Sequence, residues 1–155
     1  MDVRGLHGLS CKMSAGRWSR HGAANELIKK ALSSANIPSV LEPVGLTRRD
    51  GRRSDGMTMI PWCRGRSLVW DFTCCDTVAR SHVQQTSVLA GSAADAAEAR
   101  KVAHYSDLAA DYIFSPVAVE TFGSVGTSST RFIRDLSKRL IEVSGDKRAG
   151  QYFRQ

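Results

Sequence analysis

The sequence predicts one α/β fold in which a small mixed sheet is flanked by helices. Three observations indicate this fold. A segment with helical spacing of its apolar residues comes first, and three short segments with strand character follow it. An Ala-rich helical segment then precedes a fourth strand and a final amphipathic helix. This order favours an α/β sandwich, and a chain of 155 residues suits one domain around one core.

Composition and charge narrow the function classes. The chain is 42% hydrophobic and 24% charged, which is typical of a globular protein. With 22 Lys+Arg against 15 Asp+Glu it carries a net charge of +7. Such a balance favours nucleic acid as partner, or an acidic membrane surface, although charge alone is equally compatible with a basic protein that binds neither. No run of about 18 apolar residues occurs, so we expect no segment that spans a membrane. DNA is favoured, and we expect no membrane partner.

Residues 1–20 are rich in Gly, Ser and Arg, and we expect them to be a loosely ordered linker. His7 and Cys11 have the spacing of the second half of a zinc knuckle, whose first two cysteines would lie upstream. On spacing alone, this is either chance or the end of a knuckle cut off in a fragment. Zn²⁺ is expected only if the upstream half exists. The adjacent Cys74 and Cys75 suit reduced thiols inside the cell.

The first helix is expected from about His21 to Ala35, where Asn36 and Pro38 end it. Asn25 and Glu26 lie in its first turns. They are either part of a solvated helix face or polar groups that support a metal site from behind.

The predicted strands follow. Residues 39–46 favour a first strand that Pro43 ends early, and residues 48–53 form an Arg-rich Asp-Gly turn. Residues 52–60 and 67–73 read as two neighbouring strands joined by the basic connection 61–66. Arginines beside a phosphodiester site would contact phosphates, whereas elsewhere they would form a solvated loop.

Each of these two strands carries an aspartate that apolar burial does not explain. The two-residue period places Leu68, Trp70, Phe72 and Cys74 on one face, and Val69, Asp71, Thr73 and Cys75 on the other. A carboxylate among buried residues has to be paired, hydrogen-bonded or bound to a metal. Asp55 and Asp71, on adjacent strands, would together suit a hard cation such as Mg²⁺. Alternatively, Asp55 caps a turn, and a local hydrogen bond or a lysine satisfies the carboxylate of Asp71.

After a polar stretch, a long helix is expected from about Ser92 to Tyr112, with Ser92 and Asp95 as a capping-box-like start. One stripe of this helix holds Ala94, Ala97, Lys101, Tyr105 and Leu108. Lys101 either extends its ammonium group to solvent along this stripe or, if the stripe faces the sheet, points toward the aspartates.

The last elements are a strand over 113–120 and a helix around 132–141, followed by a basic tail over 146–155. Pro116 favours an edge position or a bulge for this strand. The helix carries Arg134, Lys138 and Arg139 on the face opposite its apolar stripe. We therefore expect three parts: the linker 1–20, a domain over 21–145 and the tail 146–155.

The order of these motifs resembles the PD-(D/E)XK restriction-endonuclease fold, with its α-β-β-β-α-β core. More narrowly, it is similar to the restriction-like endonuclease domain at the C-terminus of some non-LTR retrotransposon polyproteins. The resemblance runs from His7 to about Glu120. It rests on Arg53-Ser54-Asp55, on Val69 to Thr73 around the second acid, and on Lys101 with Tyr105 on the following helix. His21 and Asn25 match a polar pair of the first helix.

The resemblance implies a metal-dependent endonuclease that nicks DNA to prime reverse transcription. Asp55, Asp71 and the backbone carbonyl of Phe72 would bind Mg²⁺ or Mn²⁺, and Lys101 would position the attacking water. The expected DNA contacts are Arg52, Arg53, Arg64 and Arg66, and the expected supporting polar groups are Glu26, Asn25, Thr73 and Tyr105. Under the resemblance, His7 and Cys11 become the end of a knuckle.

Two positions depart from the family pattern. Ser54 stands where the motif has proline, and Thr73 stands where the wider fold class has its lysine. DNA is the expected partner, with element RNA a further one through the parent polyprotein, and the substrate implies a nuclear location. The alternatives are a nucleic-acid-binding module of the same fold without catalysis and a structural interaction domain.

Overall fold

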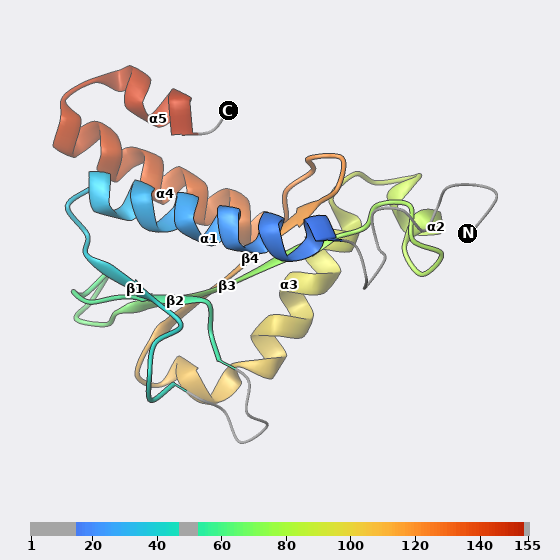
Figure 1. The fold of residues 1–155 in the computed structure, drawn as a ribbon, viewed down its shortest axis with the longest axis horizontal. Coiled ribbons are helices and arrows are strands. Elements are labelled where there is room, and N and C mark those ends of the chain that lie inside the picture. The colour runs from blue at the N-terminus through green and yellow to red at the C-terminus, as the bar shows by residue number, and fades with distance from the viewer. Residues whose placement is uncertain (1–14, 47–52, 154–155) are drawn as a thin grey trace.

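A computed structural model describes residues 15–46 and 53–153, and it has helices on both faces of one sheet (Figure 1). In chain order the elements are α1 (Ala15–Ser34), β1 (Ser39–Leu41), β2 (Gly56–Thr58), β3 (Leu68–Cys75), α2 (Val83–Thr86), α3 (Ser92–His104), the 3₁₀-helix η1 (Ser106–Ala109), β4 (Ile113–Glu120), α4 (Thr127–Ser144) and α5 (Lys147–Phe153). None of the described helices is long and apolar enough to cross a membrane.

The sheet is mixed, with strand order β1-β2-β3-β4. The pairs β1–β2 and β2–β3 are antiparallel, and β3–β4 is parallel over its whole length from Leu68↔Ile113 to Cys75↔Glu120. A parallel pair needs a crossover, and here α2, α3 and η1 supply it. This architecture confirms the predicted α/β fold class and its α-β-β-β-α-β order.

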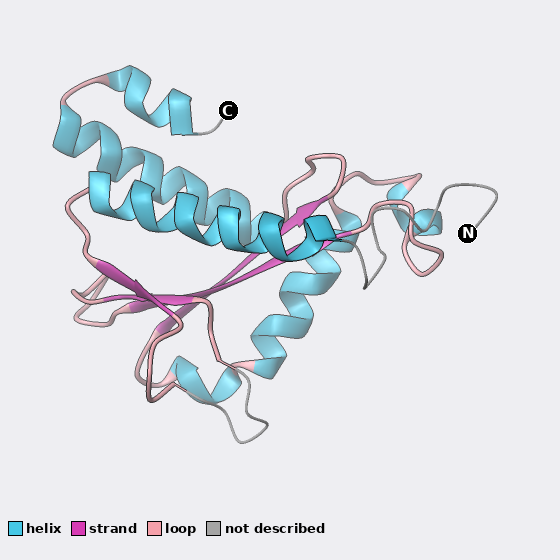
Figure 2. Cartoon of the chain, viewed as in Figure 1, coloured by secondary structure: helices cyan, strands magenta, loops and turns pink. Residues whose placement is uncertain are grey.

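The larger core lies between the sheet and the layer formed by α1 and α4, which run together over one face (Figure 2). Strand β3 contributes Leu68, Trp70 and Phe72 to it. The residues of β3 that alternate with these face α3. On that face Cys75 packs with Ala118 and with the alanine side chains of α3. The two-residue period predicted for β3 is therefore confirmed, and it separates an aromatic layer from an alanine layer.

Strand β2 approaches β3 closely because residue 56 is glycine. A Cβ atom on Gly56 would lie 2.1 Å from Cζ2 of Trp70. The fully buried Trp70 indole therefore occupies the space that any other side chain at position 56 would fill.

Several predicted boundaries are corrected. Helix α1 begins at Ala15, so the end of the predicted linker belongs to the helix. Helix α3 ends at His104 and continues only as η1, which is shorter than the helix expected to Tyr112. The capping box is also wrong, because Gly91, with φ of +89°, is the N-cap of α3. The Asp95 carboxylate instead accepts a hydrogen bond from the Thr127 amide at 2.7 Å.

The prediction for β4 is confirmed in its bounds and in its edge position. The amide of Ile113 donates to β3, and backbone amides along a strand alternate between its two sides. The backbone nitrogen of Pro116 therefore faces away from β3, where its missing N–H removes no hydrogen bond between the strands. Helix α5 is part of the folded domain, since Ala149 and Phe153 pack against the core. Arg139 is not purely solvated, as it lies 4.0 Å from the Trp62 ring centroid.

Candidate active site

Asp55 lies immediately before β2 and is fixed by backbone on both sides. Its amide donates to the Trp70 carbonyl at 3.1 Å, and its carbonyl accepts from the Glu42 amide at 2.9 Å. Its side chain then extends along β3 and accepts a hydrogen bond at Oδ2 from the Phe72 amide at 2.6 Å. The carboxylate is thus held against β3 at the point where β2 has ended.

Asp71 reaches the same region from the face of β3 that is covered by α3. Its Oδ2 accepts a hydrogen bond from Lys101 Nζ at 2.6 Å. Ala97 and Ala94, one and two turns before Lys101 on α3, are buried against the sheet. The α3 stripe therefore faces β3, and Lys101 points to the aspartate instead of reaching past it to solvent.

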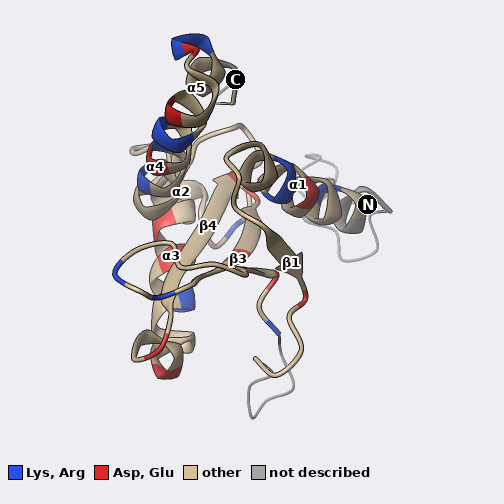
Figure 3. Cartoon of the chain, turned by 90° about the vertical axis from the view of Figure 1, so that its left-hand side faces the viewer, with Lys and Arg blue, Asp and Glu red and all other residues tan. Residues whose placement is uncertain are grey.

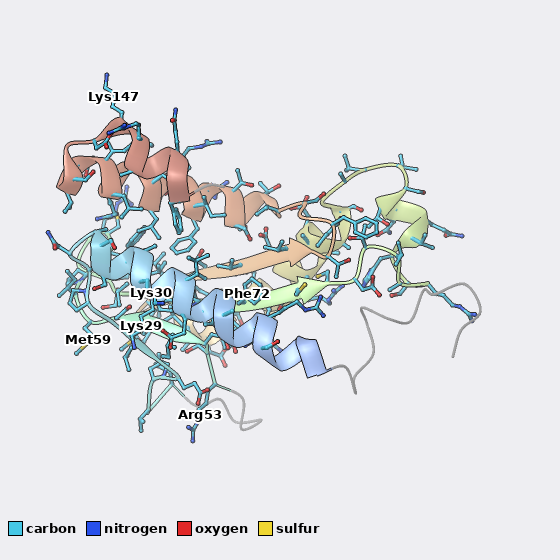
Figure 4. All side chains as sticks on the ribbon, turned by 45° about the horizontal axis from the view of Figure 1, so that its top comes forward. Lys29, Lys30, Arg53, Met59, Phe72 and Lys147 are labelled. Carbon is cyan, nitrogen blue, oxygen red and sulfur yellow. The ribbon has the colours of Figure 1, made fainter. Side chains whose placement is uncertain are left out.

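The backbone carbonyl of Phe72 faces Asp55. In an extended strand the N–H and C=O of one residue point to the same side, and the Phe72 N–H is directed at Asp55. Because β2 begins at Gly56, opposite Trp70, none of the described strands pairs with Phe72 on that side. Figure 4 shows the Phe72 side chain beside α1, away from the α3 face that carries Asp71.

A chain of hydrogen bonds from the core supports Asp55. Trp70 Nε1 donates to Asn25 Oδ1 at 3.1 Å, and Asn25 Nδ2 lies 3.3 Å from His21 Nδ1. The other ring nitrogen, His21 Nε2, lies 3.1 Å from Asp55 Oδ2. With Nδ1 accepting from the amide of Asn25, Nε2 carries the proton and donates to the carboxylate. Buried Asn25 thus orients His21, and His21 orients Asp55.

The two carboxyl groups have opposite pKa shifts. Burial alone would raise the pKa of Asp55, but the hydrogen bonds from His21 and from the Phe72 amide outweigh burial and lower it. Burial raises the pKa of Asp71, and the attraction of Lys101 only partly offsets that effect while Asp55 adds to it. Asp55 is therefore the more firmly ionised of the pair. The hydrogen bond from His21 to Asp55 raises the pKa of His21, against the effect of its burial.

Tyr105 secures the chain just before Asp55. Its hydroxyl donates to the Arg53 carbonyl at 3.2 Å, and its ring stacks on Phe114 with centroids 4.5 Å apart. The side chain is buried at the end of α3. It therefore ties the α3 end of the fold to the segment that places Asp55.

Asp71, Lys101 and His21 line a cleft of about 710 Å³. Its lining residues are His21, Arg53, Asp71, Thr73, Ala97, Arg100, Lys101, His104 and Tyr105. Most of the titratable side chains in this lining are basic. Lys and Arg also occur on α1, α4 and α5, so the positive charge of the chain is not confined to the cleft (Figure 3).

Arg100 and His104 are cleft residues that the sequence reasoning missed. They lie four residues apart on α3, so they share one side of the helix, next to Lys101. That spacing was the available signal. His21 was singled out only through the resemblance, and its contact with Asp55 joins residues far apart in the chain.

Some predicted site residues lie elsewhere. Glu26 is exposed on α1 and does not line the cleft, which matches the alternative of a solvated helix face. Arg64 and Arg66 do not line the cleft: both lie in the turn between β2 and β3, beyond the other end of β2. Arg66 Nη1 donates to the Ala109 carbonyl at 3.0 Å and so attaches that turn to η1. Arg52, His7 and Cys11 lie outside the described residues.

The oxygen groups at the cleft fit a hard cation that keeps several other ligands. Within residues 15–46 and 53–153, no three His, Cys, Asp or Glu side chains are grouped to hold a metal. Asp55, Asp71 and the Phe72 carbonyl offer oxygen alone, and Mg²⁺ accepts one or two carboxylates when water and phosphate oxygens fill the remaining positions. The donor set therefore suits Mg²⁺ or Mn²⁺ better than Zn²⁺.

Searches against models of known protein families and against curated proteins found no match to this chain.

Proposed function

We propose that this chain is a metal-dependent DNA endonuclease domain of the restriction-like type found in non-LTR retrotransposon polyproteins, and that it nicks target DNA to prime reverse transcription. The observation that carries the proposal is the convergence of Asp55, Asp71 and Lys101 at one basic cleft: Asp71 and Lys101 line it, and Asp55 contacts His21 of the same lining. These residues come from the start of β2, the middle of β3 and the second half of α3. The Lys101–Asp71 hydrogen bond supports the displaced-lysine pattern that the resemblance implies.

The proposed roles follow from the positions of the side chains. Asp55 and Asp71 would hold the cation through carboxylate oxygens, and the Phe72 carbonyl, which faces Asp55, would be a third ligand. Lys101, held at Asp71, places a positive charge where negative charge develops on the phosphoryl group. Arg53 and the basic lining hold the DNA backbone. A bound Mg²⁺ polarises the phosphoryl oxygen and lowers the pKa of the attacking water.

A second candidate function is nucleic-acid binding without cleavage. The specific observation in its favour is Ser54, which stands in place of the motif's proline with a buried hydroxyl that has no hydrogen-bond partner among the described residues. The basic lining would bind phosphates with or without a metal. This candidate predicts DNA affinity that falls with salt, and no nicking.

The proposal is tested by nicking of supercoiled plasmid with Mg²⁺, with EDTA, and with Asp71→Asn. We expect nicking that needs Mg²⁺ and falls at least about a hundredfold in the variant, as for removal of a group that stabilises transition-state charge. Asp135→Asn is the matched control. Asp135 pairs with Lys138 on α4 and does not line the cleft, so its variant should nick like the parent protein.

Two results would contradict the proposal. Nicking that persists undiminished in Asp71→Asn would remove the two-carboxylate site. Folded protein that binds DNA and never nicks it with Mg²⁺ or Mn²⁺ would leave the binding module as the function. Folding of each variant is checked by its circular dichroism spectrum and its unfolding midpoint.

A further inference from the structure

The cleft has a direction, because α3 runs opposite to β3. The crossover leaves the carboxyl end of β3 and returns to the start of β4, beside the amino end of β3. The first turn of α3 therefore packs beside Cys75, where Ala93 and Ala94 form a cluster with it. The end of α3 lies beside the start of β4, where Tyr105 stacks on Phe114.

The two cleft arginines lie toward opposite ends of this cleft. Arg100 precedes Lys101 on α3 and therefore lies nearer to the first turn of this helix, which packs beside Cys75 at the carboxyl end of β3. Arg53 lies at the other end, where its carbonyl accepts the Tyr105 hydroxyl. The Asp71–Lys101 pair lies between them.

Both arginines are available to a ligand. Arg53 and Arg100 are exposed, and both line the cleft. Among the described residues, no ion pair or side-chain hydrogen bond engages either guanidinium group. Figure 4 shows Arg53 projecting outward from its segment. A guanidinium group presents a planar set of donors that matches two oxygens of a phosphate.

From this arrangement we infer that the cleft holds one nucleic-acid strand along the direction of β3, with Arg100 and Arg53 contacting phosphates on opposite sides of the phosphate at Asp71. The inference rests on the proposed function for the central phosphate and adds the path of the strand. It also assigns Arg100, which comes from α3 and follows no motif, as a strand-binding residue. Neither arginine contacts the carboxylates, so both act in binding.

The first test measures the binding of a fluorescent DNA duplex by anisotropy in EDTA, over a series of salt concentrations. Each lost phosphate contact lowers the slope of log K against log salt by about 0.9. We expect that decrease for Arg100→Ala and for Arg53→Ala, and about twice that decrease for the double variant. Arg134→Ala is the matched control, since Arg134 is exposed on α4 and its slope should be unchanged. Alanine suits the exposed helical position 100, so folding is preserved.

The second test locates the contacts. Neutral methylphosphonate groups are placed one at a time on each side of a mapped nick. A neutral group on one side should weaken binding of the parent protein but not of Arg100→Ala. A neutral group on the other side should weaken binding of the parent protein but not of Arg53→Ala. If both arginines respond to the same side, the proposed strand path is wrong.

The outcomes separate this inference from the proposed function. An unchanged salt slope in Arg100→Ala, together with Mg²⁺-dependent nicking by the parent, overturns the strand path and leaves the nuclease. A reduced slope in Arg100→Ala without any nicking supports Arg100 as a phosphate contact and overturns the nuclease. If Arg134→Ala changes the slope as much as Arg100→Ala does, binding is spread over the surface and the inference fails.

Discussion

Asp55 and Asp71 show how neighbouring carboxyl groups acquire different properties from their partners. Asp55 accepts a backbone amide and a histidine, which stabilise its ionised form and lower its pKa. Asp71 is more affected by burial, and its pKa rises despite the Lys101 hydrogen bond. A cation between two such groups would favour ionisation of both, and the larger change would be at Asp71.

His21→Ala is expected to reduce stability in a limited pH range. The raised pKa of His21 means that its contribution is fully present below the ordinary histidine pKa and is lost as pH rises through the folded-state value. The lowered pKa of Asp55 means that its contribution is present above the ordinary aspartate pKa and is lost as pH falls through the folded-state value. The pair therefore stabilises most between about pH 4 and 6.5.

Urea unfolding of the parent and of His21→Ala at pH 5.5 and pH 8.5 checks this expectation. The His21 side chain is 41% exposed, so solvent screens the pair and the loss at the lower pH should not exceed about 1 kcal/mol. The loss should be smaller at the higher pH. Equal losses at the two pH values would mean that packing of the ring on Phe72, and not its charge, is what the substitution removes.

Ser54→Ala is expected to stabilise the fold. The Ser54 hydroxyl is buried, and within the part of the chain that the structure describes it has no hydrogen-bond partner. Because burial of an unsatisfied hydroxyl costs about 1 to 3 kcal/mol, its removal should raise the free energy of unfolding by about 1 kcal/mol. Thermal unfolding measures the gain, and plasmid nicking should be unchanged. A lower unfolding midpoint would show that the hydroxyl is satisfied in solution.

At the scale of elements, α3 supports the start of α4 with a carboxylate from another helix. Glu98 accepts hydrogen bonds from the Ser128 and Ser129 amides at 2.7 and 2.8 Å, and it also accepts the Ser129 hydroxyl. These are unpaired donors at the first turn of a helix, where negative charge is favourable. Gly126 makes room for the contact, since a Cβ there would collide with the Glu98 carboxylate.

Glu98→Ala is therefore expected to cost about 3 kcal/mol, because it leaves buried donors without an acceptor. Asp95→Ala is the matched control. Asp95 is exposed and accepts only the Thr127 amide from α4, so its removal should cost about 1 kcal/mol or less. Chemical denaturation of both variants measures the difference, and equal losses would contradict the assignment of Glu98 as the main cap of α4.

The approach of β2 to β3 is tested by Gly56→Ala. The added Cβ would overlap the Trp70 indole, so we expect a loss of about 3 kcal/mol and a change in tryptophan fluorescence. Gly22→Ala is the control, because position 22 of α1 has nothing within 4 Å of a Cβ and should gain about 0.5 to 1 kcal/mol. A neutral Gly56→Ala would mean that the indole moves readily.

At the scale of the whole molecule, Mg²⁺ binding is expected to stabilise the folded state. A ligand at ten times its Kd adds about 1.4 kcal/mol, which raises the unfolding midpoint by a few degrees. The increase should vanish in Asp71→Asn and remain in Asp135→Asn. Calorimetry with and without Mg²⁺ measures it, and an equal increase in both variants would show that the cation acts elsewhere on the surface.

The sequence by itself determined the faces of the elements. The alternation along β3 assigned Trp70 and Asp71 to opposite layers. The α3 stripe left Lys101 either at solvent or toward the aspartates, and the structure shows that it contacts Asp71. The bounds of β4 and its edge position also followed from local pattern. These features are predictable because periodicity depends on neighbours in the chain and on burial of one face.

Only the tertiary structure decided which distant groups meet. Asn25 and Glu26 are adjacent, yet one is buried against Trp70 and the other is exposed. Arg66 was expected at the cleft and instead contacts η1, while Arg100 came to the cleft without a motif. The physical reason is that such contacts depend on how the strands pair and on where the crossover returns α3. Strand pairing and the crossover join residues far apart in the chain, and local spacing carries no information about them.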